Sequence, residues 1–443
     1  MYIKLQNVGA IKEATVDLTG LSVIAGKNGT GKSTIGKTVY TIIKSIQEQD
    51  KIVAKKQKDF IEWACKNIYF QLQGCIASAA SAKKAVSEDS ELLESTFQYG
   101  AFEQQLAQHM FEEKNLHTAY DLIDARTVSV DGFSEIVDVA TKSKVKEILR
   151  TIKDKLTPID TSTTLKESLL FMYQNVFDGQ INNLKSHLTS NVDFSGLLKY
   201  SVSNNADTVP FSDRLEITYA DPQIQQKVVQ DVTFIETPLV LQMEKIKNTE
   251  NLPIYWKDLL RKVTLQTMDP ALQNDGVRDI ATGVSDVLGG TLEYNTNTRK
   301  FEFIKKGFDK STNVSINNAA SGEKILGIFH RLASKGMFGP DKILILDEPE
   351  NHLHPEWLAV VAEVLVKLAI AKCPILITSH SPDLLQAIRF YAKRYGLSQL
   401  KMYLADSKTQ VVEDKTGKEY EIFDNLAKPI NDIFRFSIDE AVA

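Results

Sequence analysis

The chain has 443 residues, of which 43% are hydrophobic and 25% charged, the composition of an ordinary globular protein with two or three domains. It has 52 lysines and arginines against 57 acidic residues, and this formal net charge of −5 argues against a general nucleic-acid binder. The three cysteines, Cys65, Cys75 and Cys373, match no zinc-binding spacing and form no disulfide framework.

The N-terminal sequence does not predict export. Residues 1–5 lack the layout of a signal peptide. The most apolar long window, 358–377, is interrupted by Glu363, Lys367 and Lys372, which favours a packed helix followed by a strand over a membrane span. We therefore expect a cytoplasmic protein that does not enter the membrane.

The first 46 residues predict strands followed by a helix. Residues 2–8 and 14–18 are expected to form a short antiparallel pair, and the apolar run 21–25 a third strand. From Lys32 onward, apolar residues recur at helical spacing, namely Ile35, Val39, Ile42, Ile43 and Ile46. Strand, glycine-rich loop and helix thus follow in the order that a phosphate-binding loop requires.

The loop between that strand and that helix matches the pattern G-x-x-x-x-G-K-[ST] over residues 26–33. Its glycines let successive backbone N–H groups curl around phosphate oxygens. Lys32 adds a positive charge at the β and γ phosphates, and Ser33 offers a hydroxyl to Mg²⁺. The residues expected to bind ATP here are Gly26, Asn28, Gly29, Gly31, Lys32, Ser33 and Thr34. A glycine-rich turn before a helix is the alternative.

Residues 46–211 differ in character from the rest of the chain. Their pattern is helical and rich in Lys, Gln, Glu and Ser, without the sustained heptad repeat of a long coiled coil. We expect a helical insertion here, between the two parts of a head at 1–45 and 212–443.

A basic stripe lies within this insertion. Lys142, Lys146, Arg150 and Lys153 recur at helical spacing and could follow a phosphate backbone. Because Glu147 and Asp154 interleave with them, a solvated helix face is the favoured interpretation. A second and weaker basic candidate consists of Arg389, Lys393 and Arg394.

The C-terminal part predicts a parallel α/β sheet. Strand patterns occur at 214–219 and 232–235, helical patterns at 276–288 and 321–332, and a hairpin at 291–294 and 300–304. The apolar runs 342–346 and 375–378 suit strands that are covered on both faces. Pro355 and Pro382 are placed to begin the helices that follow these strands.

Polar residues follow both apolar runs. Asp347 ends the first run, where ligands collect at the carboxyl ends of parallel strands, so we expect it to face the metal. Glu348 could polarise the attacking water, and His380 could hydrogen-bond the γ-phosphate. The alternatives are acidic residues that start a turn before Pro349, and a structural histidine.

Two further candidates lie at helix ends. Ser321 and Gly322 begin a helix, where a hydroxyl and unpaired N–H groups make an anion site, although an ordinary helix cap fits equally well. His352 and His354 lack a third ligand nearby and precede a proline, which favours a loop near a dimer interface over a metal site.

Four segments together resemble ABC-type ATPases that are not transporters: 26–33, 320–324, 343–350 and 378–382. The segment 347–355 resembles the Walker B motif and D-loop of bacterial AAA-domain proteins related to the OLD and RecF/SMC-like ATPases. This resemblance implies an α/β fold, an ABC-type P-loop ATPase head with an N-terminal antiparallel part and a mixed or parallel sheet flanked by helices. It does not extend to the insertion.

The resemblance also implies a homodimer that binds two ATP head-to-tail. One subunit would hold ATP and Mg²⁺ through Lys32, Ser33 and Asp347. The facing subunit would supply Ser321 and Gly322 as the signature motif, which reads Ala-Ser-Gly-Glu-Lys rather than the transporter form.

Within the same resemblance, Glu348 would be the catalytic base and His380 the γ-phosphate switch. The Q-loop residue remains open: Glu236 holds a plausible position, and Gln71 and Gln73 compete with it.

OLD nucleases carry a further nuclease domain, for which the stretch after His380 is too short. The resemblance is then to the ATPase subunits of two-gene anti-phage systems such as PARIS and Septu. We therefore expect a homodimer, assembling into a higher homo-oligomer, that controls a separate nuclease or toxin encoded nearby. The alternatives are a DNA-repair or chromosome-maintenance ATPase that binds DNA directly and, less compatible with the insertion and signature, the nucleotide-binding subunit of a transporter.

Overall fold

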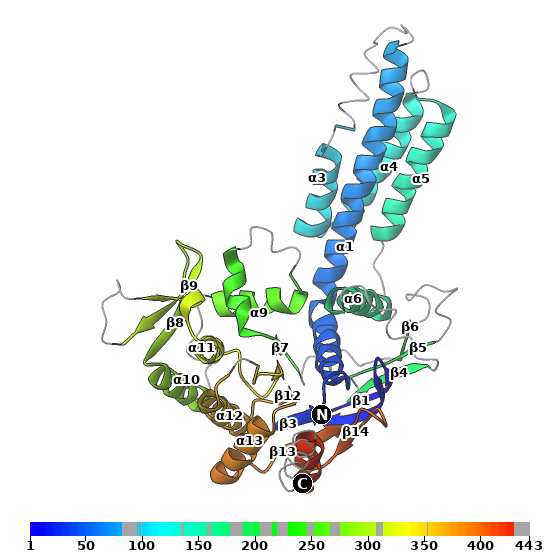
Figure 1. Ribbon diagram of the computed structural model, residues 1–443. Helices are drawn as coiled ribbons and strands as arrows, with labels where there is room; N and C mark the ends of the chain where they lie inside the picture. Colours follow the sequence, from blue (N-terminus) through cyan, green and yellow to red (C-terminus); the bar gives the residue numbers. More distant parts are fainter. Residues whose placement is uncertain are drawn as a thin grey trace, which may run out of the picture. The chain divides into compact units, whose positions relative to one another are not determined.

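The computed structural model describes residues 1–81, 95, 97–98, 100–133, 137–156, 161–177, 189–195, 197–203, 215–218, 229–245, 252–265, 275–306, 313–351 and 353–428 (Figure 1). The chain divides into two compact units. Met1–Gln47 together with Leu169–Ala443 form one, here called the head unit, and Glu48–Ser168 form the other, the helical unit. Two helices contribute residues to both units, α1 (Lys32–Ser81) and α6 (Thr161–Val176).

A mixed sheet organises the head unit. Eleven strands of the described chain take the order β6-β5-β4-β1-β2-β14-β13-β3-β12-β11-β7. Their bounds are β1 (Tyr2–Val8), β2 (Ile11–Asp17), β3 (Leu21–Gly26), β4 (Ser190–Phe194), β5 (Leu198–Val202), β6 (Leu215–Thr218), β7 (Asp231–Ile235), β11 (Lys342–Asp347), β12 (Ile375–Ser379), β13 (Leu400–Ala405) and β14 (Val411–Asp414).

The strands β13, β3, β12, β11 and β7 are parallel, whereas β6, β5, β4, β1 and β2 pair antiparallel. Every residue of β3 and β12 is buried, as expected for strands that are covered on both faces. The predicted α/β head, with its antiparallel N-terminal part, is thereby confirmed. The first strand pair differs in one detail: β2 begins at Ile11 rather than at residue 14, because Ile11 is buried and pairs with Val8.

Helices cover both faces of the parallel strands. The remaining helices of the head unit are η3 (Pro238–Lys245), α9 (Ile254–Thr264), α10 (Asp275–Leu288), η7 (Ile316–Asn318), α11 (Ser321–Ser334), α12 (Pro355–Ile370) and α13 (Pro382–Tyr395). On one face, alternate residues of β3, β11 and β12 share a core with α10 to α13. On the other, α1 lies so close that a Cβ on Gly36 would come within 3.1 Å of Ile345 and Phe234 side-chain atoms.

A second, smaller sheet packs beside α11. It consists of β8 (Gly290–Asn295), β9 (Lys300–Lys305) and β10 (Val314–Ser315), in the order β10-β9-β8. The strands β8 and β9 pair antiparallel, which confirms the hairpin predicted at 291–294 and 300–304. A helical segment at 419–428 ends the described chain.

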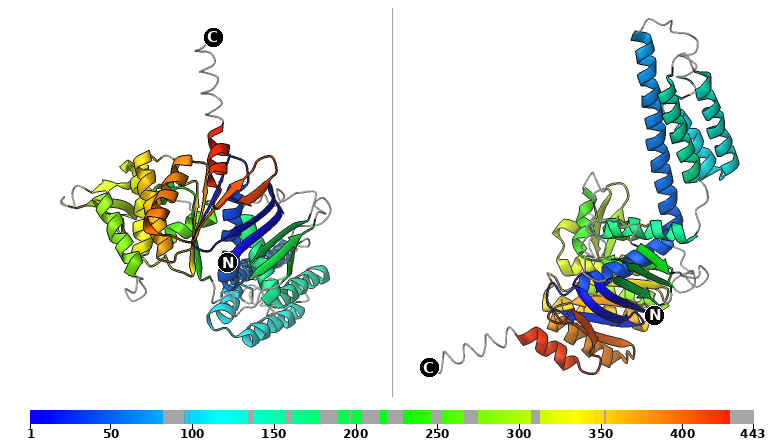
Figure 2. Two further views of the ribbon diagram at one scale, coloured as in Figure 1. Left: turned by 90° about the horizontal axis from the view of Figure 1, so that it is seen from below. Right: turned by 90° about the vertical axis from the view of Figure 1, so that its right-hand side faces the viewer.

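The helical unit has an apolar core of its own. Besides its part of α1, it contains α3 (Ala101–Ala107), the π-helix η1 (Gln108–Glu112), α4 (Leu116–Gly132) and α5 (Val139–Leu156). Buried residues of α1, α3, α4 and α5 share one cluster, and both views in Figure 2 show α4 and α5 beside α1. The unit ends earlier than the insertion expected over 46–211, because β4 and β5, within that range, belong to the large sheet of the head.

Across the residues that the structure describes, every helix is too short or too polar to cross a bilayer.

A cluster of buried charges joins α1, β7 and α9. The Nζ atom of Lys44 lies 2.9 Å from Asp231 Oδ1 and 3.1 Å from Asp258 Oδ1. Lys262 Nζ lies 2.7 Å from Asp231 Oδ2 and 3.1 Å from Asp258 Oδ2. Burial lowers the pKa of Lys262, and the two carboxylates partly oppose that shift. The pairs therefore neutralise charges that the fold has removed from water.

Replacing Lys262 with methionine is expected to lower the free energy of unfolding by about 3–5 kcal/mol, because it leaves two buried carboxylates with one buried cation fewer. Denaturant titration followed by circular dichroism measures the effect. The exposed Lys300 serves as a control, and Lys300→Met is expected to unfold like the wild type. Equal midpoints for the two variants would contradict a stabilising role for the cluster.

Candidate functional site

The predicted phosphate-binding loop connects β3 to α1. Gly26 ends β3, where a Cβ would come 2.6 Å from the backbone oxygen of Ala405. Gly31 has a φ of +86°, and a Cβ there would lie 2.8 Å from a side-chain carbon of Ile11. Both positions therefore require glycine. Asn28 and Gly29 lie exposed in the loop.

Lys32 is the first residue of α1 and is almost completely buried. Its Nζ donates hydrogen bonds to the backbone oxygens of Gly26 at 2.8 Å and Lys27 at 2.9 Å, and lies 3.7 Å from Glu348 Oε1. Burial lowers the pKa of Lys32, while Glu348 and Asp347 oppose that shift. The loop thus holds a cation at its centre, where a polyphosphate would be attracted.

The residues predicted to hold Mg²⁺ meet in the structure. Ser33 Oγ donates to Asp347 Oδ1 at 2.9 Å, and Thr378 Oγ1 donates to the same oxygen. Burial raises the pKa of Asp347, and these two hydrogen bonds oppose the shift. Mg²⁺ in nucleotide sites takes one or two protein oxygens together with phosphate oxygens, so the Ser33 hydroxyl and the Asp347 carboxylate fit that ion. Thr34, next along α1, donates its backbone N–H to Gly31 O at 3.0 Å.

Thr378 was not predicted as a site residue. It reaches Asp347 because β11 and β12 are adjacent parallel strands in which Asp347 lies opposite Thr378. Both apolar runs were identified as strands, but their pairing register was needed to bring these two residues together.

Of the three Q-loop candidates, Glu236 lies beside this site. It follows β7, the neighbour of β11, and its Oε1 lies 3.2 Å from Lys37 Nζ on α1. Tyr255 and Trp256 each donate a hydrogen bond of 3.0 Å to its Oε2. Lys37 lowers the pKa of Asp347 and Glu236 raises it, which places both charges within electrostatic range of that carboxylate. Gln71 and Gln73 belong to the helical unit.

Glu348 and His380, predicted as base and switch, lie beside each other. Oε1 of Glu348 is 3.4 Å from His380 Nδ1, and Asn351 Nδ2 donates to Oε2 at 3.2 Å. The backbone of Glu348 has a φ of +48°, a conformation that costs a non-glycine residue about 1–3 kcal/mol. Its N–H donates to Thr378 O at 2.9 Å, which helps to hold this turn.

Glu350 also reaches this cluster, although the sequence suggested no role for it. One of its oxygens accepts hydrogen bonds from the side chain of Ser379 and from the backbone N–H groups of His380 and Ser381. As with Thr378, the signal for this contact lies in strand adjacency and not in motif spacing.

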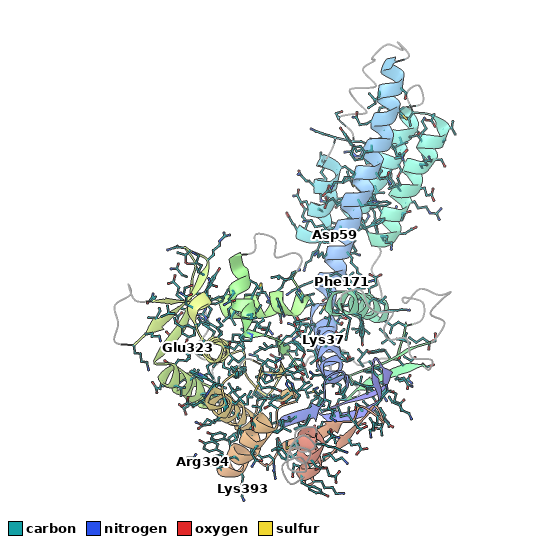
Figure 3. All side chains as sticks on the ribbon, in the orientation of Figure 1. Lys37, Asp59, Phe171, Glu323, Lys393 and Arg394 are labelled. Atoms are coloured by element: carbon teal, nitrogen blue, oxygen red, sulfur yellow. The ribbon has the colours of Figure 1, made fainter. Side chains whose placement is uncertain are left out.

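Ser321 and Gly322 lie apart from the P-loop. Ser321 begins α11 but does not cap it, because Ala320 holds the cap position. A Cβ on Gly322 would lie 2.4 Å from the Trp357 ring. Figure 3 shows Glu323, in the first turn of α11, well separated from Lys37 on α1. In the described part of the chain, neither Ser321 nor Gly322 hydrogen-bonds to the P-loop.

The two histidines that were discounted as metal ligands follow β11. His354 caps α12, and its Nδ1 accepts a hydrogen bond of 3.3 Å from the backbone N–H of Glu356. His352 lies outside the described residues. Over the described ranges, no group of three or more His, Cys, Asp or Glu side chains is placed to hold a metal ion.

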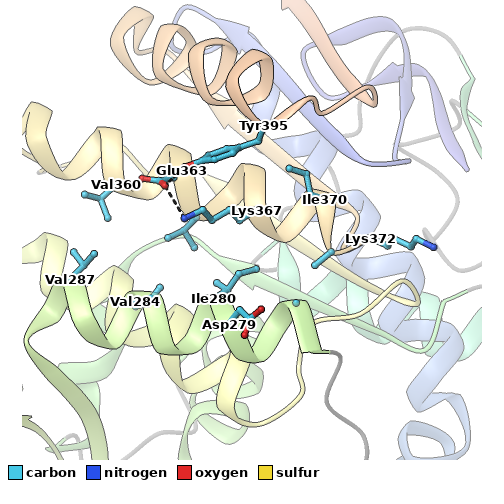
Figure 4. A pocket seen from close by; sticks show the side chains of 14 residues that line it. Asp279, Ile280, Val284, Val287, Val360, Glu363, Lys367, Ile370, Lys372 and Tyr395 are labelled. Atoms are coloured by element: carbon cyan, nitrogen blue, oxygen red, sulfur yellow. Dashed lines mark hydrogen bonds and ion pairs between the residues drawn. The ribbon is translucent and has the colours of Figure 1, made fainter.

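A cavity of about 800 Å³ lies between α10 and α12 (Figure 4). Valine and isoleucine make up six of its fourteen lining residues. Among the polar ones, Glu363 and Lys367 pair at 2.8 Å, and the Tyr395 hydroxyl donates a hydrogen bond to Glu363. It includes none of the residues predicted to bind ATP, so it is separate from the nucleotide site.

A family model described as an AAA ATPase domain matches residues 1–385. The chain belongs to this family. The protein therefore contains a nucleotide-binding ATPase domain of the AAA type, in agreement with its P-loop fold.

No curated protein matches the chain. Solved structures with some similarity to the chain include an Smc head bound to the C-winged helix domain of ScpA, with 11% identity, coverage of 93% of this chain and 95% of that one, and a TM-score of 0.36. The Smc head with an extended coiled coil from Pyrococcus furiosus is 11% identical, with coverages of 96% and 98% and a TM-score of 0.31. The Smc head domain with a coiled coil and joint from Pyrococcus yayanosii is 12% identical, with coverages of 93% and 96% and a TM-score of 0.31. We infer no activity from these distant likenesses.

Proposed function

We propose that this protein hydrolyses ATP bound between two copies of itself and that the ATP-bound form controls a separate effector protein, a nuclease or toxin, in defence against phage. One observation carries the dimer proposal. A single chain gathers Lys32, Asp347 and Glu348 at one point, while among the described residues neither Ser321 nor Gly322 hydrogen-bonds to any of these three. A second copy would complete the site.

We assign to each residue a role that suits its position. The backbone N–H groups of the P-loop and the ammonium of Lys32 bind the phosphates, and Ser33 and Asp347 hold Mg²⁺, which neutralises phosphate charge. Glu348, held next to Asp347 by its turn, takes a proton from the attacking water. His380 contacts the γ-phosphate through its ring.

ATP acts by shifting a population. The contacts of the γ-phosphate with Ser321 and Gly322 of the facing copy exist only in the closed dimer, so ATP binds that form more tightly than the monomer. Moving such an equilibrium from 1:99 to 99:1 takes a difference in affinity of about 10⁴-fold. Hydrolysis removes the γ-phosphate and with it this preference, which releases the dimer.

Two features support a role in controlling an effector. The four nucleotide-binding segments resemble those of the ATPase subunits of two-gene defence systems. In addition, α1 begins at the P-loop and continues into the helical unit, which has its own apolar core and is therefore a candidate platform for an effector.

The defence proposal is tested by phage challenge of cells that express this gene with its neighbours. We expect the efficiency of plating to fall in the presence of the intact locus, and to recover with Lys32→Ala or after deletion of the adjacent nuclease or toxin gene. Protection that persists without any neighbouring gene would contradict control of a separate effector.

Ser321→Arg is expected to leave nucleotide binding by the monomer intact and to block dimerisation. The arginine side chain is larger than that of serine and would occupy the space of the γ-phosphate bound to the facing copy. Multi-angle light scattering with a hydrolysis-resistant ATP analogue measures the mass. Ser407→Arg, at an exposed turn, is the control and should dimerise normally. A Ser321→Arg protein that still doubles its mass with nucleotide would refute the shared site.

Direct DNA binding is the rival proposal, and its best candidate is the basic stripe on α5. There Lys142 donates to Asp131 O at 3.0 Å, Lys146 pairs with Asp131 at 2.5 Å, and Lys153 pairs with Asp124 at 2.6 Å. These acidic partners on α4 reduce the charge available to a phosphate backbone. Salt-dependent DNA binding that is lost when the stripe is changed to alanine would favour the rival.

A further inference from the structure

Glu350 lies at the end of the Asp347–Glu350 segment, and its side chain is only 5% exposed. Its Oε1 accepts three hydrogen bonds from the loop after β12: from Ser379 Oγ at 2.7 Å, the His380 N–H at 2.8 Å and the Ser381 N–H at 3.2 Å. A carboxylate oxygen that gathers three donors fixes the backbone of that loop.

The same carboxylate also faces the His380 ring. Nδ1 of His380 lies 3.3 Å from Glu350 Oε1 and 3.4 Å from Glu348 Oε1. Both His380 Nδ1 and Glu350 Oε2 are buried atoms without a hydrogen-bond partner among the described residues. Buried polar atoms of this kind need an explanation. A small rotation of the ring would let Nδ1–H donate a hydrogen bond to the Glu350 carboxylate, and Nδ1 would then have a partner.

The sheet explains why Glu350 reaches this place. The parallel register of β11 and β12 sets Asp347 opposite Thr378, so the turn that carries Glu350 meets the loop that carries His380. Ser381 in that loop also caps α13, accepting a hydrogen bond of 3.2 Å from the Leu384 N–H. Glu350 thus links the strand end that bears the base to the loop that bears the switch histidine.

We propose that Glu350 is a positioning residue for His380. It holds the backbone of residues 379–381 and, when both ring nitrogens carry a proton, accepts a hydrogen bond from Nδ1–H, which fixes the orientation of the ring and leaves Nε2–H to donate to the γ-phosphate. Glu350 acts only through His380 and touches no substrate. This inference depends on the role proposed above for His380.

The test is a double-mutant cycle on turnover, with phosphate release giving kcat and calorimetry giving the Kd for ATP. Glu350→Gln keeps an acceptor oxygen for the loop but loses the charge that faces the ring, so we expect kcat to fall about tenfold while Kd changes less than twofold. In a His380→Ala background, the same substitution should cause no further loss, because its effect passes through the ring. Glu350→Ala should lose more than Glu350→Gln in the wild-type background.

The outcomes separate the two proposals. If Glu350→Gln lowers kcat equally in both backgrounds, or leaves the wild-type kcat unchanged, the positioning role is overturned while His380 keeps its function. If His380→Ala alone turns over ATP at the wild-type rate, the proposed role of His380 fails, and this inference fails with it. Unfolding midpoints equal to the wild type establish that the glutamine variant is folded.

Discussion

Replacing Lys32 with alanine is expected to abolish ATP binding and raise the Kd at least about a hundredfold. The buried ammonium is held at the centre of the loop by two backbone oxygens, where it would meet two phosphates. A hydrogen bond to a charged group contributes about 1.5–3 kcal/mol, and each 1.4 kcal/mol corresponds to about tenfold in affinity. Isothermal titration calorimetry with ATP and Mg²⁺ measures the Kd.

Two controls protect this interpretation. Lys32→Met keeps the length of the side chain and removes only the charge, so it should lose affinity to a similar extent while filling the same space. Lys300→Ala removes an exposed lysine of β9 and should bind like the wild type. Wild-type ATP affinity in a folded Lys32→Ala protein would rule out the P-loop role.

Replacing Glu348 with glutamine is expected to retain ATP binding but slow phosphate release by about 10²–10⁴-fold, the usual contribution of a general base. The amide keeps the shape of the side chain beside His380 and cannot take a proton from water. ATP should therefore persist in the site and trap the closed dimer, visible as a stable doubling of mass by light scattering.

The matched control is Glu356→Gln, which changes an exposed carboxylate in the first turn of α12. It should hydrolyse ATP at the wild-type rate. If Glu348→Gln does the same, another group must accept the proton, and the assignment of the base is wrong.

The elements around the P-loop were predictable because each depends on local sequence. Buried strands such as β3 and β12 appear as short apolar runs, and the loop has a fixed spacing of glycines, lysine and serine. The family match supports an ATPase domain over residues 1–385.

The predicted end of the helical insertion, residue 211, lies beyond the end of the helical unit at Ser168. The reason is that β4 and β5 carry only a weak local signal for strand formation. In Ser190–Phe194 and Leu198–Val202, buried residues alternate with exposed or half-buried ones. The strand that joins β4 to the rest of the sheet is β1, almost two hundred residues earlier. Such strands become evident only when the sheet that they extend is known. Thr378 and Glu350 were not predicted as site residues for a related reason, since their contacts depend on which strands are neighbours.

The left-handed backbone of Glu348 has an evolutionary consequence. Glycine or asparagine would adopt that conformation more readily, so selection for heat resistance alone should replace this glutamate. Each such replacement would raise the free energy of unfolding and remove the proton acceptor. Lineages in which nucleotide occupancy suffices as the signal should therefore drift to glycine or asparagine at this position, and lineages that need the signal to end should keep the acid.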